Sequence, residues 1–88
     1  MEYFVEDSNG QKTIIEIVKR ETKEQILTEY IALRKEKGLS QEDIARLTGI
    51  ARPNISRIEN GKYDPTLEVL TRLASALNRK LEIHFVEK

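Results

Sequence analysis

The chain has 88 residues and a formal net charge of zero, because its 15 lysines and arginines match its 15 aspartates and glutamates. Its composition, 39% hydrophobic and 34% charged, is that of a folded globular domain and excludes a disordered segment. A domain of this size buries only about 60 to 65% of the surface that its unfolded chain exposes. We therefore expect its stability to be marginal and to benefit from pairing with a second subunit.

The residue types that are missing also exclude several kinds of site. The chain has no cysteine, which excludes disulfides, thiolate metal sites and cysteine nucleophiles, and its single histidine, His84, leaves too few ligands for an ordinary zinc site. We expect no metal and no cofactor. The first seven residues do not resemble a signal peptide, and nothing approaches the roughly 18 consecutive apolar residues of a membrane span. The expected location is the cytoplasm, without a membrane partner.

The charge is distributed unevenly along the chain. Residues 1–31 carry four basic and seven acidic side chains, residues 32–62 carry seven and four, and residues 63–88 carry four of each. Positive charge is concentrated in the middle third, which is where an anionic partner would dock.

The first twenty residues are rich in strand formers. Residues 3–5 and the β-branched run 13–18 are separated by turn formers that end in Asn9 and Gly10. A β-hairpin over residues 1–20 is the simplest interpretation, although the nearly continuous apolar run after the turn also fits a buried helical segment.

Two helices are predicted next. Thr22 and Gln25 form a capping-box pattern at the start of the first, and Gly38 stops it. Its apolar residues recur at helical spacing: Ile26, Leu27, Tyr30, Ile31 and Leu33. The second helix is short. It begins after Ser40, a good N-cap with Asp43 three residues later, and ends at Gly49.

Two more helices and a strand complete the pattern. The third helix follows Ala51, a poor cap, but Pro53 suits a first turn, and Asn60 and Gly61 end it. Thr66 caps the fourth helix, and Asn78 is its expected left-handed stop. One apolar stripe runs along this helix: Leu67, Leu70, Leu73, Ala74 and Leu77. Residues 80–86 then alternate between apolar and polar side chains, which predicts a half-buried strand.

The second and third helices have the spacing of a helix-turn-helix. Ala45 is small enough for the two helices to approach each other, and Gly49 allows the tight turn. Three apolar side chains hold the second of these helices in place: Ile50, Ile55 and Ile58. The pattern is specific because all of these positions lie at fixed offsets.

Residues 33–77 resemble the Xre family of phage-repressor-like helix-turn-helix domains, most closely in residues 33–41 and 58–62. The resemblance implies a dimer that binds operator DNA, with Gln41 on a phosphate and Arg34 and Glu59 in a structural ion pair. The strand-like ending and the N-terminal extension are similar to small HigA-type antitoxins. Those proteins repress their own operon and neutralise a ribosome-dependent ribonuclease toxin.

The expected fold is accordingly mainly α, a phage-repressor-like domain of four to five helices. We expect an N-terminal β-hairpin over residues 1–20, a helix-turn-helix domain over residues 21–78 and a C-terminal strand over residues 79–88.

The third helix supports DNA binding independently of the resemblance. With Ile55, Ile58 and Glu59 facing inward, its other side carries arginines, whose planar fork matches the O6 and N7 acceptors of guanine. The expected base-contacting residues are Arg52, Pro53, Asn54, Ser56 and Arg57. Phosphate contacts are expected from the start of the second helix and from side chains beside the groove, namely Ser40, Gln41, Arg46, Asn60 and Lys62. The alternative for the arginines is an ordinary solvated helix face.

No pattern indicates catalysis. Thr48 and Ser56 have no histidine or acid placed to activate them, so an enzyme is not expected. The favoured hypothesis is a dimeric, sequence-specific transcriptional repressor, and an antitoxin role is compatible with it. The alternative is a protein-interaction module that neutralises a toxin or binds another protein without specific DNA binding, which the zero net charge would suit.

The resemblance implies pairing near the loop and the fourth helix, and the predicted C-terminal strand is a second expected site of dimerisation. An edge strand leaves hydrogen-bonding groups free to pair with its twofold mate or with the N-terminal hairpin. Its apolar face would supply the dimer contacts: Leu81, Ile83 and Phe85.

Overall fold

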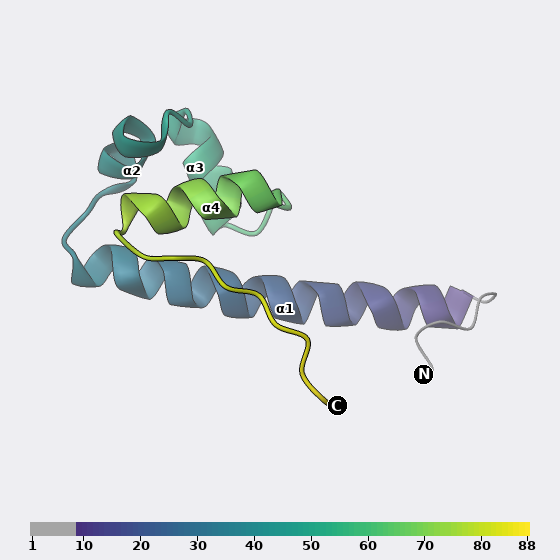
Figure 1. Ribbon diagram of the computed structural model, residues 1–88. Helices are drawn as coiled ribbons and strands as arrows, with labels where there is room; N and C mark the ends of the chain where they lie inside the picture. The colour runs from purple at the N-terminus through teal and green to yellow at the C-terminus, as the bar shows by residue number, and fades with distance from the viewer. Residues whose placement is uncertain (1–8) are drawn as a thin grey trace.

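The computed structural model describes residues 9–88, with side chains from residue 14 onward. Four helices make up this part of the chain: α1 (Asn9–Glu36), α2 (Gln41–Thr48), α3 (Arg52–Glu59) and α4 (Leu67–Ala76). Figure 1 shows α2, α3 and α4 gathered over the C-terminal half of α1, while the N-terminal half of α1 extends away from them as an arm. The predicted mainly helical fold is confirmed.

The core forms where the four helices meet. Its central side chains are Ile44 of α2 and Ile55 and Ile58 of α3, each no more than 1% exposed. The other helices add apolar side chains around them: Leu27, Tyr30, Leu73 and Leu77. Because α2 and α3 have only eight residues each, they are too short to be stable alone and depend on this packing.

Most of the predicted helix ends are confirmed. The Ser40 hydroxyl accepts from the Asp43 amide at 3.0 Å, and the Asp43 carboxylate accepts from the Ser40 amide at 2.8 Å, which completes the capping box of α2. Gly49 ends α2 with a left-handed φ of 77°. Thr66 caps α4 by accepting from the Val69 amide, and Asn78 after α4 has a φ of 57°. These ends depend on contacts within a few residues, which a sequence pattern records directly.

The predicted N-terminal hairpin is wrong for the residues that the structure describes. Residues 9–20 form the beginning of α1, so Asn9 and Gly10 lie in a helix and not in a turn; residues 1–8 lie outside the described range. Thr22 is inside the same helix, where its hydroxyl donates to the Val18 carbonyl at 3.0 Å, and is not an N-cap. No glycine or proline interrupts residues 11–37, and a helix needs no partner strand for its backbone hydrogen bonds.

The predicted C-terminal strand is also wrong. Within residues 9–88 the structure has no strand, and residues 79–88 run as an irregular segment that starts beside α1 and α4. A strand needs a neighbour with which to exchange hydrogen bonds. Because the hairpin expected to provide one is a helix over residues 9–20, the described chain offers this segment no partner.

Removal of the α4 cap tests the packing of the short helices. We expect Thr66→Ala to lower the free energy of unfolding by about 1 kcal/mol, because the Val69 amide loses its acceptor. Urea denaturation followed by circular dichroism measures this change. The control is Thr71→Ala, since the Thr71 hydroxyl bonds to the Leu67 carbonyl inside α4 and caps nothing. Equal losses in the two variants would contradict the capping role of Thr66.

Candidate nucleic-acid interface

One side of α3 faces solvent and carries the side chains expected to contact bases. Arg52, Pro53, Asn54 and Arg57 are exposed, and Ser56 is half-buried at the border with the core. Arg57 Nη1 donates to Asn54 Oδ1 at 3.1 Å, which uses one of the five donors of the guanidinium. The solvent-facing part of the helix thus includes two arginines and an amide.

This surface is positively charged and has no competing carboxylate from its own segment. The only acidic residue between Ile50 and Tyr63 is Glu59. Its side chain is 6% exposed and is neutralised by Arg34, so it adds little negative potential to the outer side of α3. Such a surface suits the acceptor-rich major groove and the phosphates beside it.

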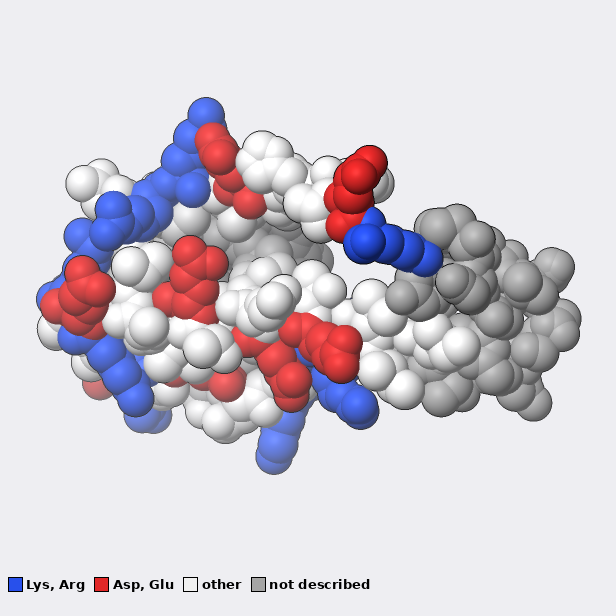
Figure 2. All heavy atoms as spheres, turned by 90° about the horizontal axis from the view of Figure 1, so that it is seen from below, with Lys and Arg blue, Asp and Glu red and all other residues white. Residues whose placement is uncertain are grey.

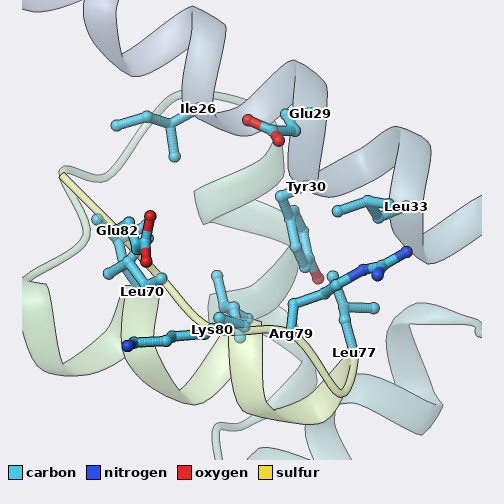
Figure 3. Close-up of a pocket in the computed structure, with 12 residues that line it drawn as sticks. Ile26, Glu29, Tyr30, Leu33, Leu70, Leu77, Arg79, Lys80 and Glu82 are labelled. Atoms are coloured by element: carbon cyan, nitrogen blue, oxygen red, sulfur yellow. The ribbon is translucent and has the colours of Figure 1, made fainter. Parts of the chain in front are cut away.

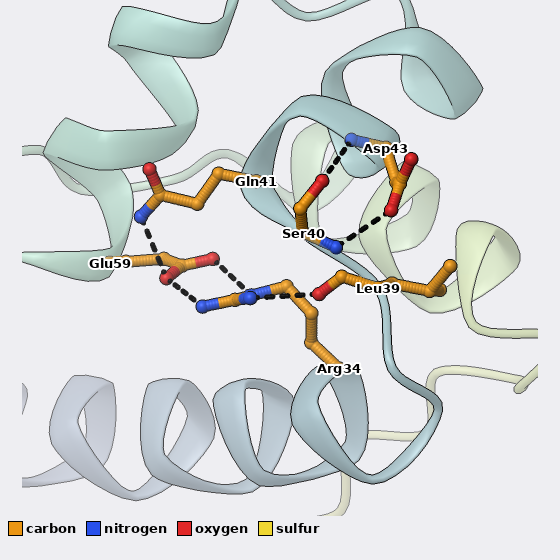
Figure 4. A network of polar contacts seen from close by, with 6 residues as sticks. All are labelled: Arg34, Leu39, Ser40, Gln41, Asp43 and Glu59. Carbon is orange, nitrogen blue, oxygen red and sulfur yellow. Dashed lines mark hydrogen bonds and ion pairs between the residues drawn. The ribbon is translucent and has the colours of Figure 1, made fainter.

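Arg34 connects three parts of the chain through one guanidinium (Figure 4). Its Nε and Nη2 donate to the two carboxylate oxygens of Glu59 at 2.9 and 2.8 Å, a bidentate pair between α1 and α3. Its Nη1 donates to the Leu39 carbonyl at 2.9 Å, in the loop that precedes α2. The Arg34 side chain is only 11% exposed, so this ion pair is shielded from water and solvent ions.

Gln41 joins the same network from the start of α2. Its Nε2 donates to Glu59 Oε1 at 3.1 Å, which holds the first residue of α2 against the last residue of α3. The capping box of α2 uses the backbone amides of Ser40 and Asp43. The amides of Gln41 and Glu42, also in the first turn, take no part in it. A helix N-terminus of this kind favours an anion, because its amides and dipole both point toward it.

The remaining residues expected to contact phosphate lie at the edges of this surface. Arg46 and Lys62 are exposed, as are Ser40 and Asn60. Arg46 lies 3.2 Å from Asp43 in an exposed ion pair, so part of its charge is already balanced. No ion pair involves Lys62 within the part of the chain that the structure describes. Of the two cations at these edges, Lys62 is therefore more available to a phosphate than Arg46.

The turn between α2 and α3 is held by contacts that the sequence patterns did not reveal. The Thr48 hydroxyl donates to the Ile44 carbonyl at 2.7 Å and accepts from the Ile50 amide at 3.1 Å. Arg72 Nη1, from α4, donates to the Thr48 carbonyl at 3.1 Å. Arg72 lies 24 residues from Thr48 along the chain, so no local spacing indicated this contact.

A second group of contacts attaches the middle of α1 to the loop after α3. Lys23 Nζ lies 2.7 Å from Asp64 and donates to the Gly61 carbonyl at 3.0 Å, and Lys19 lies 3.0 Å from Asp64. Hydrogen bonds from these lysines hold the pKa of Asp64 below its usual value. The hydrogen bond from the Ser40 amide likewise lowers the pKa of Asp43, so both carboxylates stay ionised over the physiological range.

The face of the molecule formed by α1 has a different character. Figure 2 shows acidic side chains across the middle of this face and basic ones mainly toward its edges. The exposed carboxylates of α1 include Glu16, Glu21, Glu24 and Glu29. Within the core beneath, burial raises the pKa of Tyr30 above its usual value, and the nearby Glu59 carboxylate raises it further. The acidic face and the cationic side of α3 are thus carried by different elements.

Comparison with known proteins agrees with this geometry. Residues 31–83 match the profile of the HTH_3 family, which is described as helix-turn-helix. A Haemophilus influenzae protein named as an uncharacterized HTH-type transcriptional regulator is 38% identical over 58 residues, which are 66% of this chain and 59% of that protein. The chain therefore spans about three fifths of this relative's length. No helix of residues 9–88 is long and apolar enough to cross a membrane.

Two further similarities concern toxin–antitoxin proteins. Antitoxin HigA1 of Mycobacterium tuberculosis is 42% identical over 53 residues, 60% of this chain and 36% of the antitoxin. A solved structure described as a toxin-antitoxin module from Streptococcus pneumoniae superposes with a TM-score of 0.64 at 28% identity. This superposition covers 92% of this chain and 84% of the other, so it extends beyond the helix-turn-helix segment.

The buried ion pair provides a test of how α3 is held. We expect Glu59→Gln to lower the free energy of unfolding by about 3 kcal/mol, because Arg34 would keep a buried charge without its counter-ion. Urea denaturation measures the loss. The matched control is Glu68→Gln, which removes an exposed ion pair with Arg72 and should cost no more than about 0.5 kcal/mol. A Glu59→Gln variant as stable as the control would contradict the structural role of the pair.

Proposed function

Because the chain belongs to the HTH_3 helix-turn-helix family, we propose that it is a sequence-specific DNA-binding transcriptional regulator that acts as a dimer on an operator. The observation that carries the proposal is the outer side of α3, where Arg52 and Arg57 face solvent and the one acidic residue of the segment is buried in an ion pair. The name of the Haemophilus influenzae relative supports the same role.

In the proposed complex, α3 enters the major groove and α2 lies across the DNA backbone. Arg52 and Arg57 read guanine edges, and Asn54 pairs with adenine or bonds to a phosphate. The first turn of α2 accepts a phosphate on its amides, and Lys62 holds another on the opposite side of the groove. The network of Arg34, Glu59 and Gln41 keeps α2 and α3 in the relative orientation that this docking needs.

The modest charge of a single interface favours a dimer. Residues 32–62 carry seven basic and four acidic side chains, an excess of three positive charges. One of the basic side chains, Arg46, forms an ion pair with Asp43. Few phosphate contacts per copy give weak binding at physiological salt, whereas two copies on adjacent half-sites combine their contacts. We therefore propose repression by a dimer on an inverted-repeat operator.

Two substitutions separate base reading from phosphate binding. We expect Arg52→Ala to weaken operator binding by about 1–3 kcal/mol and to relax the base preference at one position per half-site. Lys62→Ala should weaken binding to all sequences alike and reduce the salt slope by about one unit per site. Gel-shift titrations measure both effects, on the promoter of the gene that encodes this chain and on competitor DNA, each at two salt concentrations.

The control for these titrations is Arg20→Ala, which removes an exposed arginine from the arm of α1, outside the proposed interface. It should bind DNA as the wild type does. Unchanged binding by Arg52→Ala would contradict the assignment of α3 as the recognition helix. Wild-type binding without any preference over competitor DNA would favour a protein-interaction module in place of a specific regulator.

A second role, as the antitoxin of a toxin–antitoxin pair, is supported by the similarity to the Streptococcus pneumoniae module and to antitoxin HigA1. The arm of α1 provides an apolar surface for such a contact. Four of its side chains are 38–41% exposed: Ile14, Ile15, Ile17 and Val18. Clustered exposed aliphatic groups of this kind mark protein contacts.

Co-expression with the product of an adjacent reading frame tests the antitoxin role. We expect a complex that purifies as one species and is lost in the Ile17→Lys variant, while DNA binding is kept, because Ile17 lies on the arm away from α3. A neighbouring product that neither binds the chain nor is neutralised by it would contradict this role.

A further inference from the structure

The C-terminal segment carries apolar side chains that the single chain does not cover. Leu81 is half-buried, but Ile83 is 57% exposed, Val86 is 83% exposed and Phe85 is fully exposed. Leu81, Ile83 and Phe85 alternate with the polar residues Glu82 and His84. This alternation is the pattern of a strand with one apolar face, in a segment that has no partner strand in the described chain.

We propose that residues 80–86 pair with the same residues of a second copy of this chain, as an antiparallel two-stranded ribbon whose twofold axis passes through Ile83. The proposal rests on the dimer of the proposed function and names the surface that forms it. The observation behind it is that the central residues of the segment, 81–85, are complementary to themselves in the register centred on Ile83.

In the register centred on Ile83, the five central residues, 81–85, are matched on both faces of the ribbon, and Lys80 lies opposite Val86 at each end. On one face, Ile83 lies opposite Ile83 of the second copy, and Leu81 lies opposite Phe85. On the other face, Glu82 lies opposite His84, so that an acceptor faces a donor. Pairs directly opposite each other are the ones that stabilise an antiparallel ribbon, through apolar contact or opposite polarity.

The neighbouring registers each bring unlike or repelling groups together. A register centred on Glu82 places two carboxylates opposite each other. A register centred on His84 places Leu81 opposite Glu87 and Lys80 opposite Lys88. Registers between these, displaced by a single residue, set the apolar face of one strand against the polar face of the other. The register centred on Ile83 avoids these mismatches among residues 81–85 and leaves only the end pair of Lys80 and Val86 unmatched.

A hollow beside the segment can receive the aromatic ring of Phe85 from the second copy. Figure 3 shows this hollow, which has a volume of about 530 Å³ and lies between α1, α4 and residues 79–82. Its apolar lining includes Ile26, Tyr30, Leu33, Leu70 and Leu81. In the proposed register, Phe85 of the second copy lies beside Leu81. Because Leu81 lines the hollow, the ring lies at its mouth. The same pairing thus covers both the exposed Phe85 and the open apolar lining.

Charge substitutions at the axis test the pairing and its register. Sedimentation equilibrium should give the wild type twice the chain mass of 10.2 kDa. Ile83→Glu and Ile83→Lys should each lower the mass toward that of a single chain, because the twofold axis places two like charges opposite each other. Mixed in equal amounts, the two variants should recover the dimer mass, since a carboxylate then lies opposite an ammonium group.

The control is Val86→Glu, which places a carboxylate opposite Lys80 of the second copy and should leave the dimer intact. Circular dichroism of each variant checks that the helices are kept; we expect no loss, because residues 83 and 86 lie outside α1 to α4. A wild type that sediments as a monomer, an Ile83→Glu variant that remains a dimer, or a mixture that does not recover the dimer would each overturn the proposal.

These results are distinguishable from a failure of the proposed function. A dimer that resists Ile83→Glu but still binds one DNA sequence preferentially overturns the ribbon and keeps the regulator. A dimer that responds as predicted but binds all DNA alike keeps the ribbon and overturns the specific regulator.

Discussion

The bidentate ion pair between Arg34 and Glu59 is the interaction on which the arrangement of the other elements depends. A buried pair of charges repays its desolvation only when the remaining donors and acceptors are also satisfied. Here the Leu39 carbonyl takes a third donor of Arg34, and Gln41 donates to Glu59, so one network reaches α1, α2 and α3. It also withdraws the only carboxylate of the α3 segment from the outer surface. The same contact therefore orients α3 and leaves its exposed side cationic.

Local motifs made much of this fold predictable from the sequence. The cap at Ser40, the turn at Gly49 and the cap at Thr66 each depend on contacts within a few residues, and all are present. The hairpin and the C-terminal strand were wrong because strand formation depends on a partner that local composition does not identify. The β-branched run 13–18 is part of helix α1, and no glycine or proline interrupts this helix over the next eighteen residues. The alternation of apolar and polar side chains in residues 80–86 indicates an amphipathic segment, but it does not produce a strand in a single chain.

The candidate interface was likewise predictable from the sequence only in part. Helical periodicity around Ile55 and Ile58 was enough to predict which side chains of α3 face solvent. It could not predict that Arg72 holds the carbonyl of Thr48, or that Lys23 binds Asp64, because these partners are 24 and 41 residues apart. Such contacts depend on how α4 and the middle of α1 pack against the helix-turn-helix. They hold the helix-turn-helix in place, whereas the residues proposed to touch DNA remain on its outside.

The zero net charge is an average over surfaces of different charge. The arm of α1 combines exposed carboxylates with aliphatic side chains and suits protein contact, whereas α3 carries the unopposed arginines. The central claim is that this chain reads DNA sequence with α3 as a twofold dimer. Selection of bound sequences from random double-stranded DNA by the wild-type chain tests it most directly. The account predicts enrichment of an inverted repeat whose half-site centres lie about 10–10.5 base pairs, or a multiple of this distance, apart. Recovered DNA with no common sequence, or with a single unrepeated site, would contradict it.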